Sequence, residues 1–534
     1  MNCYVHDRAG FEGRRSHQER SAHTGWLARA CAALIFCAAA ALALPAQTLT
    51  TLHEFDRSDG ANPYAALLQA NDGNLYGTTQ FGGASHNCRS IYGVYGCGTI
   101  FKISPSGTLT TLYSFCSQTG CTDGAAPVAG LVQDAQGNLY GATIGGGAND
   151  SDLCGDGEYI GCGTVFKITP RGALTTLYSF CSQSDCTDGT LPGGGLVQAT
   201  DGNFYGTTAA GGTGVCSNPS NPGCGTVFRI TPSGTLTTLH TFCTLSNCPD
   251  GAIPYSALLQ ASDGNLYGTT GAGGAYSYSY GGTIFKMTLT GALTTLHSFD
   301  RWDGTIPAAL IQALDGNFYG TTLGGGLNGM GGTVFKMTPA GALSSLYNFC
   351  TMDNCTDGRD PYGALIQGTD GNFYGTTWGG GTGSAGSVFG ITPGGTLTTL
   401  YSFCHQLNCT AGQLPNAGLF QDTDGTFYGA NAFSSNTSHA CPQGCGALFS
   451  LSVGLGAFVM EQPTVGKVGA PVRILGTNLT GATSVTFNGT AATFKVISPS
   501  LITTTVPTGA TSGRMEVTTP GGTLSSNKPF RVKQ

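Results

Sequence analysis

The sequence of 534 residues contains few charged residues, because Asp, Glu, Lys and Arg together make up only 10% of it. The formal net charge is −7, and no basic run or stripe occurs. Proteins that bind nucleic acids concentrate Lys and Arg side chains against the phosphate backbone. The composition therefore argues against a nucleic-acid partner.

Side chains suited to catalysis are also scarce. Beyond residue 46 the chain has only six His and four Glu residues, and no nucleophile motif such as GxSxG occurs. The His residues that do not recur between repeats, His86, His405 and His439, fall in different predicted loops. General acid–base catalysis needs groups within hydrogen-bond reach of one another. We therefore predict no catalytic residue, no metal site and no cofactor.

The chain also lacks an apolar run as long as the roughly 20 residues of a membrane-spanning helix. Its most apolar segment, residues 30–44, is rich in Ala, follows several Arg residues and ends in ALPAQ. These features are typical of a secretory signal peptide. We predict such a peptide over residues 1–46, with cleavage near Ala46, and an exported mature chain without a membrane span. An uncleaved membrane anchor is the alternative.

Glycine is abundant, with 86 residues, and much of it belongs to a repeated phrase. DGNLYGTT begins at Asp72 and returns six more times in closely similar form. The later copies begin at Gln136, Asp201, Asp263, Asp315, Asp370 and Asp424. In the first repeat, residues 65–70, 75–79, 99–104 and 108–115 are short apolar or β-branched segments separated by turn residues. Each repeat is therefore predicted to form four strands.

Seven four-stranded sheets bury their faces when they pack radially, as in a seven-bladed β-propeller. Residues 48–55 (TLTTLHEF) match a fourth strand without the three before it, and the seventh repeat ends after ALFSL at residues 447–451. We expect the N-terminal strand to complete the last blade, which would leave no free sheet edge. An open solenoid is the alternative, although caps are absent. The predicted propeller covers residues 47–459.

Eighteen Cys residues outside the leader fall into nine close pairs. Five are spaced CxxxxC: Cys116/Cys121, Cys181/Cys186, Cys243/Cys248, Cys350/Cys355 and Cys404/Cys409. The other four are Cys88/Cys97, Cys154/Cys162, Cys216/Cys224 and Cys441/Cys445. An even number in an exported chain indicates disulfides. Clustered thiolates that bind zinc are the alternative, but no companion pair follows at zinc-like spacing.

In a propeller, the loops after the second strands and the links between blades share one face. The cystines and the variation in loop length belong to this face, where we expect a binding site. Nine aromatic residues in these loops are the candidates, since aromatic rings suit sugar and protein surfaces. They are Phe81, Tyr92, Tyr95, Tyr159, Tyr276, Tyr278, Tyr280, Trp378 and Phe433. Alternatively, these rings cover their own loops.

Residues that recur in every repeat are more simply explained by blade packing. His53, His240 and His297 occupy a position that is Tyr in other repeats. A Lys or Arg recurs in the third strand, where we expect a packed stem with a solvated or Asp-paired head. The Asp of each DGxxP link, replaced once by Ala411, is predicted to cap a turn rather than to bind calcium. Where CxxxxC is absent, DRSDG (residues 56–60) or DRWDG (residues 300–304) is expected to form a short Asp/Arg turn instead.

Residues 48–459, with DGNLYGTT, GGTIFKMT and GALTTLHSF in each unit, resemble the GloVer-type tandem repeat of exported bacterial proteins. The DGN turn, the aromatic strand and the ITPxG turn resemble, more loosely, the blades of streptogramin B lyase. That lyase is a seven-bladed propeller, but its catalytic residues have no match in this chain. The resemblance implies export and surface display.

The C-terminal part, residues 460–534, differs in character, with β-branched residues alternating with Thr and turns every eight to twelve residues. This pattern predicts a β-sandwich. GTNL, VTFNGTAA and VTTPGG resemble an IPT/TIG domain, an immunoglobulin-like module. The predicted protein is therefore all-β: a propeller followed by an immunoglobulin-like sandwich.

These observations favour a secreted or cell-surface binding module that recognises a glycan or a surface protein through its cystine-containing loops. The alternatives are a lyase or hydrolase with a site at the propeller centre, and a purely structural envelope component. The sequence leaves the oligomeric state open.

Overall fold

The computed structural model describes residues 47–88, 93–149, 154, 161–216, 223–276, 281–327, 329, 331–404, 409, 411–434, 437 and 441–533. The predicted signal peptide, residues 1–46, lies outside these ranges and stays a prediction. Within the described ranges, no helix has the length and apolar character that crossing a membrane requires.

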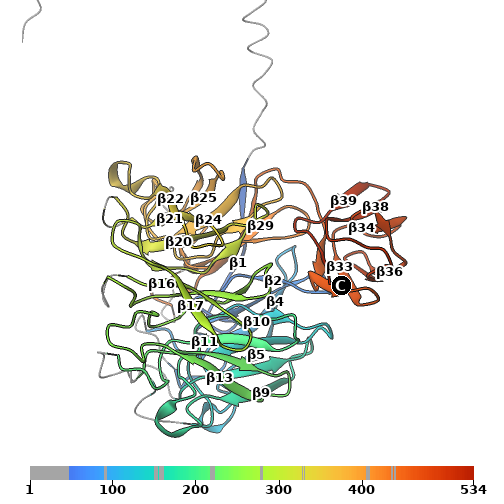
Figure 1. Ribbon diagram of the computed structural model, residues 1–534. Helices are drawn as coiled ribbons and strands as arrows, with labels where there is room; N and C mark the ends of the chain where they lie inside the picture. The colour runs from blue at the N-terminus through green and yellow to red at the C-terminus, as the bar shows by residue number, and fades with distance from the viewer. Residues whose placement is uncertain are drawn as a thin grey trace, which may run out of the picture. The chain divides into compact units, whose positions relative to one another are not determined.

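Seven antiparallel sheets form the blades of a β-propeller, and in the first six blades the four main strands follow one another along the chain (Figure 1). The first three blades consist of β2 (Leu68–Gln69), β3 (Leu75–Thr79), β4 (Thr99–Ile103) and β5 (Leu109–Ser114); β6 (Val132–Gln133), β7 (Leu139–Thr143), β8 (Thr164–Ile168) and β9 (Leu174–Ser179); and β10 (Val197–Gln198), β11 (Phe204–Thr208), β12 (Thr226–Ile230) and β13 (Leu236–Thr241). Blades four to six consist of β14 (Leu259–Gln260), β15 (Leu266–Thr270), β16 (Thr283–Met287) and β17 (Leu293–Ser298); β19 (Ile311–Gln312), β20 (Phe318–Gly324), β21 (Thr333–Met337) and β22 (Leu343–Asn348); and β23 (Ile366–Gln367), β24 (Phe373–Thr377), β25 (Ser387–Ile391) and β26 (Leu397–Ser402). Short strands β18 (Thr305–Pro307) and β27 (Gln413–Pro415) extend the fifth and seventh sheets.

The seventh blade combines both ends of the propeller, as predicted. It contains β28 (Phe420–Gln421), β29 (Phe427–Phe433), β30 (Ala447–Ser452) and the N-terminal strand β1 (Thr48–Glu54). Strand β1 pairs antiparallel with β30, from Thr48 opposite Ser452 to Glu54 opposite Ala447. In Figure 1 the blue strand lies among the orange ones. This pairing removes the edge that the last blade would otherwise expose.

A ring of aromatic contacts links every blade to the next. A Phe after each fourth strand packs edge-on or tilted against a Phe in the third strand of the following blade, with ring centroids 5.2–5.4 Å apart. The pairs are Phe55–Phe101, Phe115–Phe166, Phe180–Phe228, Phe242–Phe285, Phe299–Phe335, Phe349–Phe389 and Phe403–Phe449. Since the last two blades and the first are linked in the same way, the ring is closed and the solenoid alternative is excluded.

The glycine of the repeated LYGTT or FYGTT strand makes room for this packing. A Cβ atom built on Gly77 would lie 2.5 Å from the ring of Phe101 on the neighbouring strand. The glycine at this position in each of the other six blades faces the equivalent Phe. A side chain here would displace the ring that joins two blades, which explains the Gly in an otherwise β-favouring strand.

The second strand occupies the predicted residues 75–79, but the first strand is shorter than predicted. Only Leu68–Gln69 pair as β2, whereas residues 65–70 were expected. The backbone before this strand makes hydrogen bonds outside the sheet. Asn62 N–H donates to Cys445 O in the seventh blade, and Gln80 N–H donates to Asn62 O. The start of the predicted strand is therefore a connection between blades.

The C-terminal part forms a β-sandwich, as the sequence predicted. One sheet contains β31 (Met460–Gln462), β33 (Pro471–Leu475), β37 (Leu501–Thr505) and β36 (Phe494–Ser498). The other contains β35 (Thr490–Ala491), β34 (Ser484–Phe487), β38 (Met515–Thr519) and β39 (Gly522–Ser525), and β32 (Val465–Lys467) pairs with β40 (Arg531–Lys533). Buried residues of both sheets, including Val472, Ile502, Phe487 and Val517, share one core.

Candidate functional site

Two sets of connections meet at one face of the propeller, which we call the loop face. They are the loops from second to third strands and the links from each fourth strand to the next blade. Antiparallel pairing puts both sets at the same end of the blades and puts the short turns at the other end. At that other end, Lys286 Nζ lies 2.8 Å from the Asp263 carboxylate, as expected for the recurring Lys.

Four of the five CxxxxC links hold an Asp carboxylate at their centre. After β5, Cys116–Cys121 closes the 3-10 turn η1 (Thr119–Cys121). The Asp123 carboxylate accepts hydrogen bonds from Tyr113 Oη at 2.8 Å and from Ser117 N–H at 2.9 Å. Burial raises the pKa of Tyr113 to about 12. The hydrogen bond with Ser117 lowers this pKa, whereas the hydrogen bond to Asp123 and the charge of Asp123 raise it further. Tyr113 therefore stays protonated and donates to Asp123.

The links that contain Cys248 and Cys409 differ from this arrangement, although all five share the CxxxxC spacing. In the link of Cys186, the 3-10 turn η2 (Ser184–Cys186) is followed by Thr187, whose backbone N–H donates to Ser184 O. Pro249 follows Cys248 and has no N–H to donate, and no 3-10 turn occurs among the described residues of that link. Ala411 stands after Cys409 where the other links have Asp, so that link lacks the central carboxylate. The five CxxxxC links therefore share a disulfide but differ in their turns and in the central carboxylate.

Their disulfides are nevertheless present: Cys243–Cys248 and Cys404–Cys409 have Cα atoms 4.1 Å and 4.3 Å apart. These two cystines are largely buried within their links. Cys248 is only 4% exposed and packs in the core with Phe242, and Cys409 is partly buried. These two disulfides therefore support the links and offer little surface to a ligand.

Where Tyr is replaced by His, the same Asp contact is kept. His53, His240 and His297 place Nε2 within 2.6–2.9 Å of Asp59, Asp250 and Asp303. The prediction that these His residues are structural is confirmed by these pairings.

The two DRxDG links form the turn that was expected to replace the disulfide. The Asp56 carboxylate accepts the Ser58 N–H at 2.9 Å, and the Asp300 carboxylate accepts the Trp302 N–H at 2.7 Å. These turn contacts use the carboxylates and the backbone rather than the Arg side chains. Each Arg side chain is left to interact with the loop face above it.

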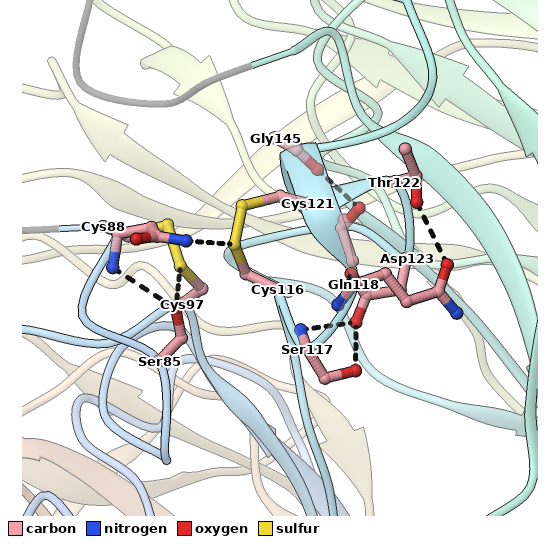
Figure 2. The surroundings of a disulfide bond; sticks show 12 residues. Ser85, Cys88, Cys97, Cys116, Ser117, Gln118, Cys121, Thr122, Asp123 and Gly145 are labelled. Carbon is pink, nitrogen blue, oxygen red and sulfur yellow. Dashed lines mark hydrogen bonds between the residues drawn. A yellow bond between two sulfur atoms is a disulfide. The ribbon is translucent and has the colours of Figure 1, made fainter.

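All nine predicted disulfides are present, and in blades one to three they lie in pairs. Figure 2 shows the Cys88–Cys97 disulfide of the first loop beside the Cys116–Cys121 disulfide of the following link. A hydrogen bond joins Cys97 Sγ and Ser85 Oγ. In blade two, the sulfur atoms of Cys154, Cys162, Cys181 and Cys186 all lie within 4.8 Å of one another. Sequence spacing missed this arrangement because the companion pair comes from the next connection. Both members of each pair are bonded, so these sulfurs form disulfides rather than a thiolate metal site.

The five predicted binding aromatics that the structure describes do not form one surface. Phe81 and Phe433 are each only 3% exposed, so the prediction that they are accessible is wrong; Phe81 packs with Phe55 in the core. Tyr95 and Tyr276 are 40% and 65% exposed, and Trp378 is partly buried. These three residues belong to blades one, four and six. Tyr92, Tyr159, Tyr278 and Tyr280 lie outside the described residues.

A ring of seven non-glycine residues with left-handed backbone surrounds the start of the first strands. Each stands just before the Pro of its link, with φ between 54° and 58°: Asn62, Ala126, Leu191, Ile253, Ile306, Asp360 and Leu414. Such a conformation is costly, especially for β-branched Ile253 and Ile306. The N–H of each donates to a carbonyl of the preceding blade, as Ala126 does to Cys97. These residues therefore join neighbouring blades, a role that the DGxxP pattern alone did not reveal.

The loop face has a hollow of about 640 Å³ over blades five and six. Arg301 and Thr305 border it from the link before blade five, and Gly324 and Gly325 from the end of β20. The other side is formed by the Cys350–Cys355 link with Arg359 and Asp360. Blades five and six have the shortest loops between their second and third strands, residues 323–332 and 378–386, and no cystine in these loops covers this region. The hollow was not predicted, because it results from what a neighbouring loop leaves uncovered.

Arg359 Nη1 lies 3.5 Å from the Asp360 carboxylate at the edge of this hollow. Burial raises the pKa of Asp360 above its usual range, and the nearby Arg359 opposes this shift. The Arg359 side chain remains 47% exposed. The hollow therefore presents guanidinium groups to solvent.

Near the propeller axis, the first strands carry small residues. A Cβ atom built on Gly195 would lie 3.5 Å from Ala257 Cβ and 3.8 Å from Gly130 O. The first strands of neighbouring blades therefore pack closely against one another. The described His residues of the fourth strands are held by Asp at the outer parts of the blades, and His86 bonds to Arg57 at 2.7 Å. In the part of the chain that the structure describes, His and acidic side chains do not converge on the axis.

The fold and its connections define a disulfide-bonded β-propeller of tandem repeats with an immunoglobulin-like sandwich after it. The chain belongs to the Gloeobacter/Verrucomicrobia repeat family, which matches residues 40–215 and 213–449. An IPT/TIG domain matches residues 461–532. The nine disulfides indicate an oxidising, extracellular environment.

Among solved structures, a fungal alcohol oxidase of the AA5 family in complex with copper is 13% identical, with a TM-score of 0.49, 91% of this chain covered and 99% of that one. The extracellular domain of a putative hybrid two-component system from B. thetaiotaomicron is 10% identical, with a TM-score of 0.45 and coverage of 91% and 58%. The PQQ-bound aldose sugar dehydrogenase of Streptomyces coelicolor is 11% identical, with a TM-score of 0.36 and coverage of 77% and 99%. At these values none of them assigns an activity to this chain. A search of curated protein sequences finds no match.

Proposed function

We propose that the protein is a secreted or cell-surface binding module that recognises a glycan through the loop face of its propeller. The observation that carries the proposal is the hollow of about 640 Å³ over blades five and six. Ligand pockets generally measure about 300–1,000 Å³. The hollow lies on rigid blades and is bordered by short links, an arrangement that favours binding with little ordering cost.

The proposal changes one part of the sequence-based hypothesis. That hypothesis placed binding on the cystine-containing loops, whereas the hollow lies where the loops from second to third strands have no cystine. A cystine does border it, but this one belongs to the Cys350–Cys355 link. The crowded cystine loops of blades one to three are then supporting structure rather than the recognition surface.

A glycan array with two forms of the purified protein tests the proposal. In the second form, residues 323–332 are replaced by the longer residues 80–98 of blade one, which should cover the hollow. We expect the natural protein to bind at least one class of glycan and the replaced form to lose that binding while it keeps its circular dichroism spectrum. Equal binding by both forms, or none by the natural protein, would contradict the proposal.

A further inference from the structure

We propose that the hollow over blades five and six binds an acidic saccharide, whose carboxylate or sulfate groups are held by Arg301 and Arg359. This inference rests on the proposed function and names the ligand class of the same site. It depends on the charged residues that line the hollow, on a comparison with an equivalent Arg in blade one, and on the exposed ring of Trp302 beside Arg301.

The hollow is lined by two guanidinium groups and one carboxylate. Arg301 and Arg359 approach it from links on opposite sides, and Asp360 is the only acidic residue in the described lining. Guanidinium groups bind carboxylates and sulfates with paired hydrogen bonds in a planar geometry. Asp360 pairs with Arg359 at 3.5 Å, so Arg301 has no acidic partner within the described lining.

Nearby acidic residues of the two links are engaged in their own turns. Asp300 accepts backbone N–H groups of Trp302 and Asp303, while Asp303 contacts His297 at 2.7 Å. Asp357 accepts hydrogen bonds from Tyr347 Oη at 2.9 Å and from Thr351. These carboxylates keep their negative charge, but the contacts hold them within the links and none of them is part of the lining of the hollow.

Blade one shows what an Arg at this position does when a loop covers it. Arg57 occupies the same place in DRSDG as Arg301 does in DRWDG. Its guanidinium donates to the Tyr95 carbonyl at 3.2 Å, contacts His86 Nδ1 at 2.7 Å and lies 6.0 Å from the centre of the Tyr95 ring. The long loop of blade one therefore supplies the groups that satisfy Arg57.

Blade five has no such loop above Arg301. In the described part of the chain, the Arg301 guanidinium contacts the ring of Trp302 at 4.6 Å, and no carbonyl or imidazole covers it as in blade one. Its remaining N–H groups face the hollow and solvent. A ligand with anionic oxygens would supply the partners that the loop supplies to Arg57.

Trp302 gives the site an apolar surface beside the charge. Its side chain is 57% exposed, an unusual state for a large aromatic residue, and it stands next to Arg301 in the link. An exposed indole ring packs well against the apolar face of a sugar. An anionic group together with a pyranose ring is the chemistry of an acidic saccharide.

The proposal is tested by isothermal titration calorimetry of the purified protein with three probes at low salt. The probes are trigalacturonate, a sulfated heparin tetrasaccharide and neutral maltotriose. We expect at least one acidic probe to bind and maltotriose to bind at least about tenfold more weakly. The tighter acidic probe identifies carboxylate or sulfate as the preferred group. Equal affinity for neutral and acidic probes would overturn the proposal while leaving the proposed function in place.

Two variants identify the residues responsible. Arg301→Gln and Arg359→Gln should each weaken acidic binding by about tenfold to a hundredfold, the range for loss of a charged hydrogen bond. Arg171→Gln is the matched control, because Arg171 is exposed in the turn between β8 and β9 at the opposite end of the blades. It removes the same charge and should leave affinity unchanged. If the double variant Arg301→Gln/Arg359→Gln remains folded and binds within twofold of the natural protein, the proposal is wrong.

Discussion

Blades one to three and blades four to six share the same four strands, the same glycine and the same ring of Phe contacts, yet their loop faces differ. In blades one to three, loop and link cystines lie side by side and form part of the buried core. Blades four to six have Gly-rich loops and leave the hollow beside Arg301 and Arg359. The difference shows that one scaffold can support both a closed surface and an open one, since the ring of Phe contacts is the same in both halves.

The largest expected effect concerns what the two regions share. Phe166→Ala in blade two and Phe335→Ala in blade five should each lower the free energy of unfolding by about 3–5 kcal/mol, because each removes a fully buried ring from a contact between blades. Urea denaturation measures both. A much smaller loss for Phe166→Ala would mean that the cystines, rather than the ring packing, hold blades one to three together.

The second effect is specific to the cystine-rich blades. Replacing Cys154 and Cys162 with Ser should lower the free energy of unfolding by about 2–3 kcal/mol, through the added freedom of the unfolded chain. Thermal unfolding without reductant compares this variant with the natural protein. A reductant should then reduce the difference between them. An unchanged melting temperature in the variant would show that this disulfide is dispensable for blade two.

A smaller effect should follow when one of the loop residues that contact the Arg57 guanidinium is removed. His86→Ala removes the contact with the Arg57 guanidinium and should cost about 1 kcal/mol, since the pair is exposed to solvent. The same change should give Arg57 a weak affinity for the acidic probe that binds near Arg301. Calorimetry with His86→Ala, using Arg57→Gln/His86→Ala as the control, separates the two outcomes. No added heat of binding would mean that the rest of the loop still covers Arg57.

The smallest effect concerns the end of the blades opposite the loop face. Burial opposes ionisation of Asp263, but hydrogen bonds from Lys286, Asn265 and Tyr267 outweigh it and lower its pKa to about 2. A lowered folded-state pKa contributes stability above the unfolded value near 4, and this contribution disappears as the pH falls toward 2. Asp263→Asn should therefore show a slightly shallower loss of melting temperature between pH 4 and pH 2. The same slope in both proteins would contradict this.

Much of the fold follows from the repeats. The second strands, the closure by residues 48–55 and the nine disulfides are as predicted, because they depend on local spacing and on strand patterns that recur seven times. The first strand was predicted too long, since hydrogen bonds from another blade engage the backbone around Asn62. The replacement of Asp by Ala411 in the Cys409 link was visible in the sequence, whereas the different turn at Cys248, where Pro249 follows, was not predicted. Neither the length of the first strand nor the turn of the link changes the local pattern of apolar residues.

Most of the candidate site could not be predicted from the sequence. Phe81 and Phe433 look like exposed loop residues but lie in the core, because the chain turns inward at the end of the second strand. Arg301 and Arg57 are equivalent in sequence, and only the length of the loop above each distinguishes them. The accessibility of a side chain depends on a separate segment of chain, so a motif by itself does not reveal it.

The pairing of β1 with β30 has a consequence for how the protein is made. As synthesis proceeds from the N-terminus, β1 is available first, but its partner is among the last propeller strands to emerge. The intervening blades can form from neighbouring strands, whereas this pairing has the longest sequence separation in the ring. A chain that stops before β30 would keep an exposed edge on β1, a feature that promotes aggregation and proteolysis. Closure of the last blade therefore acts as a check that all seven repeats have been made.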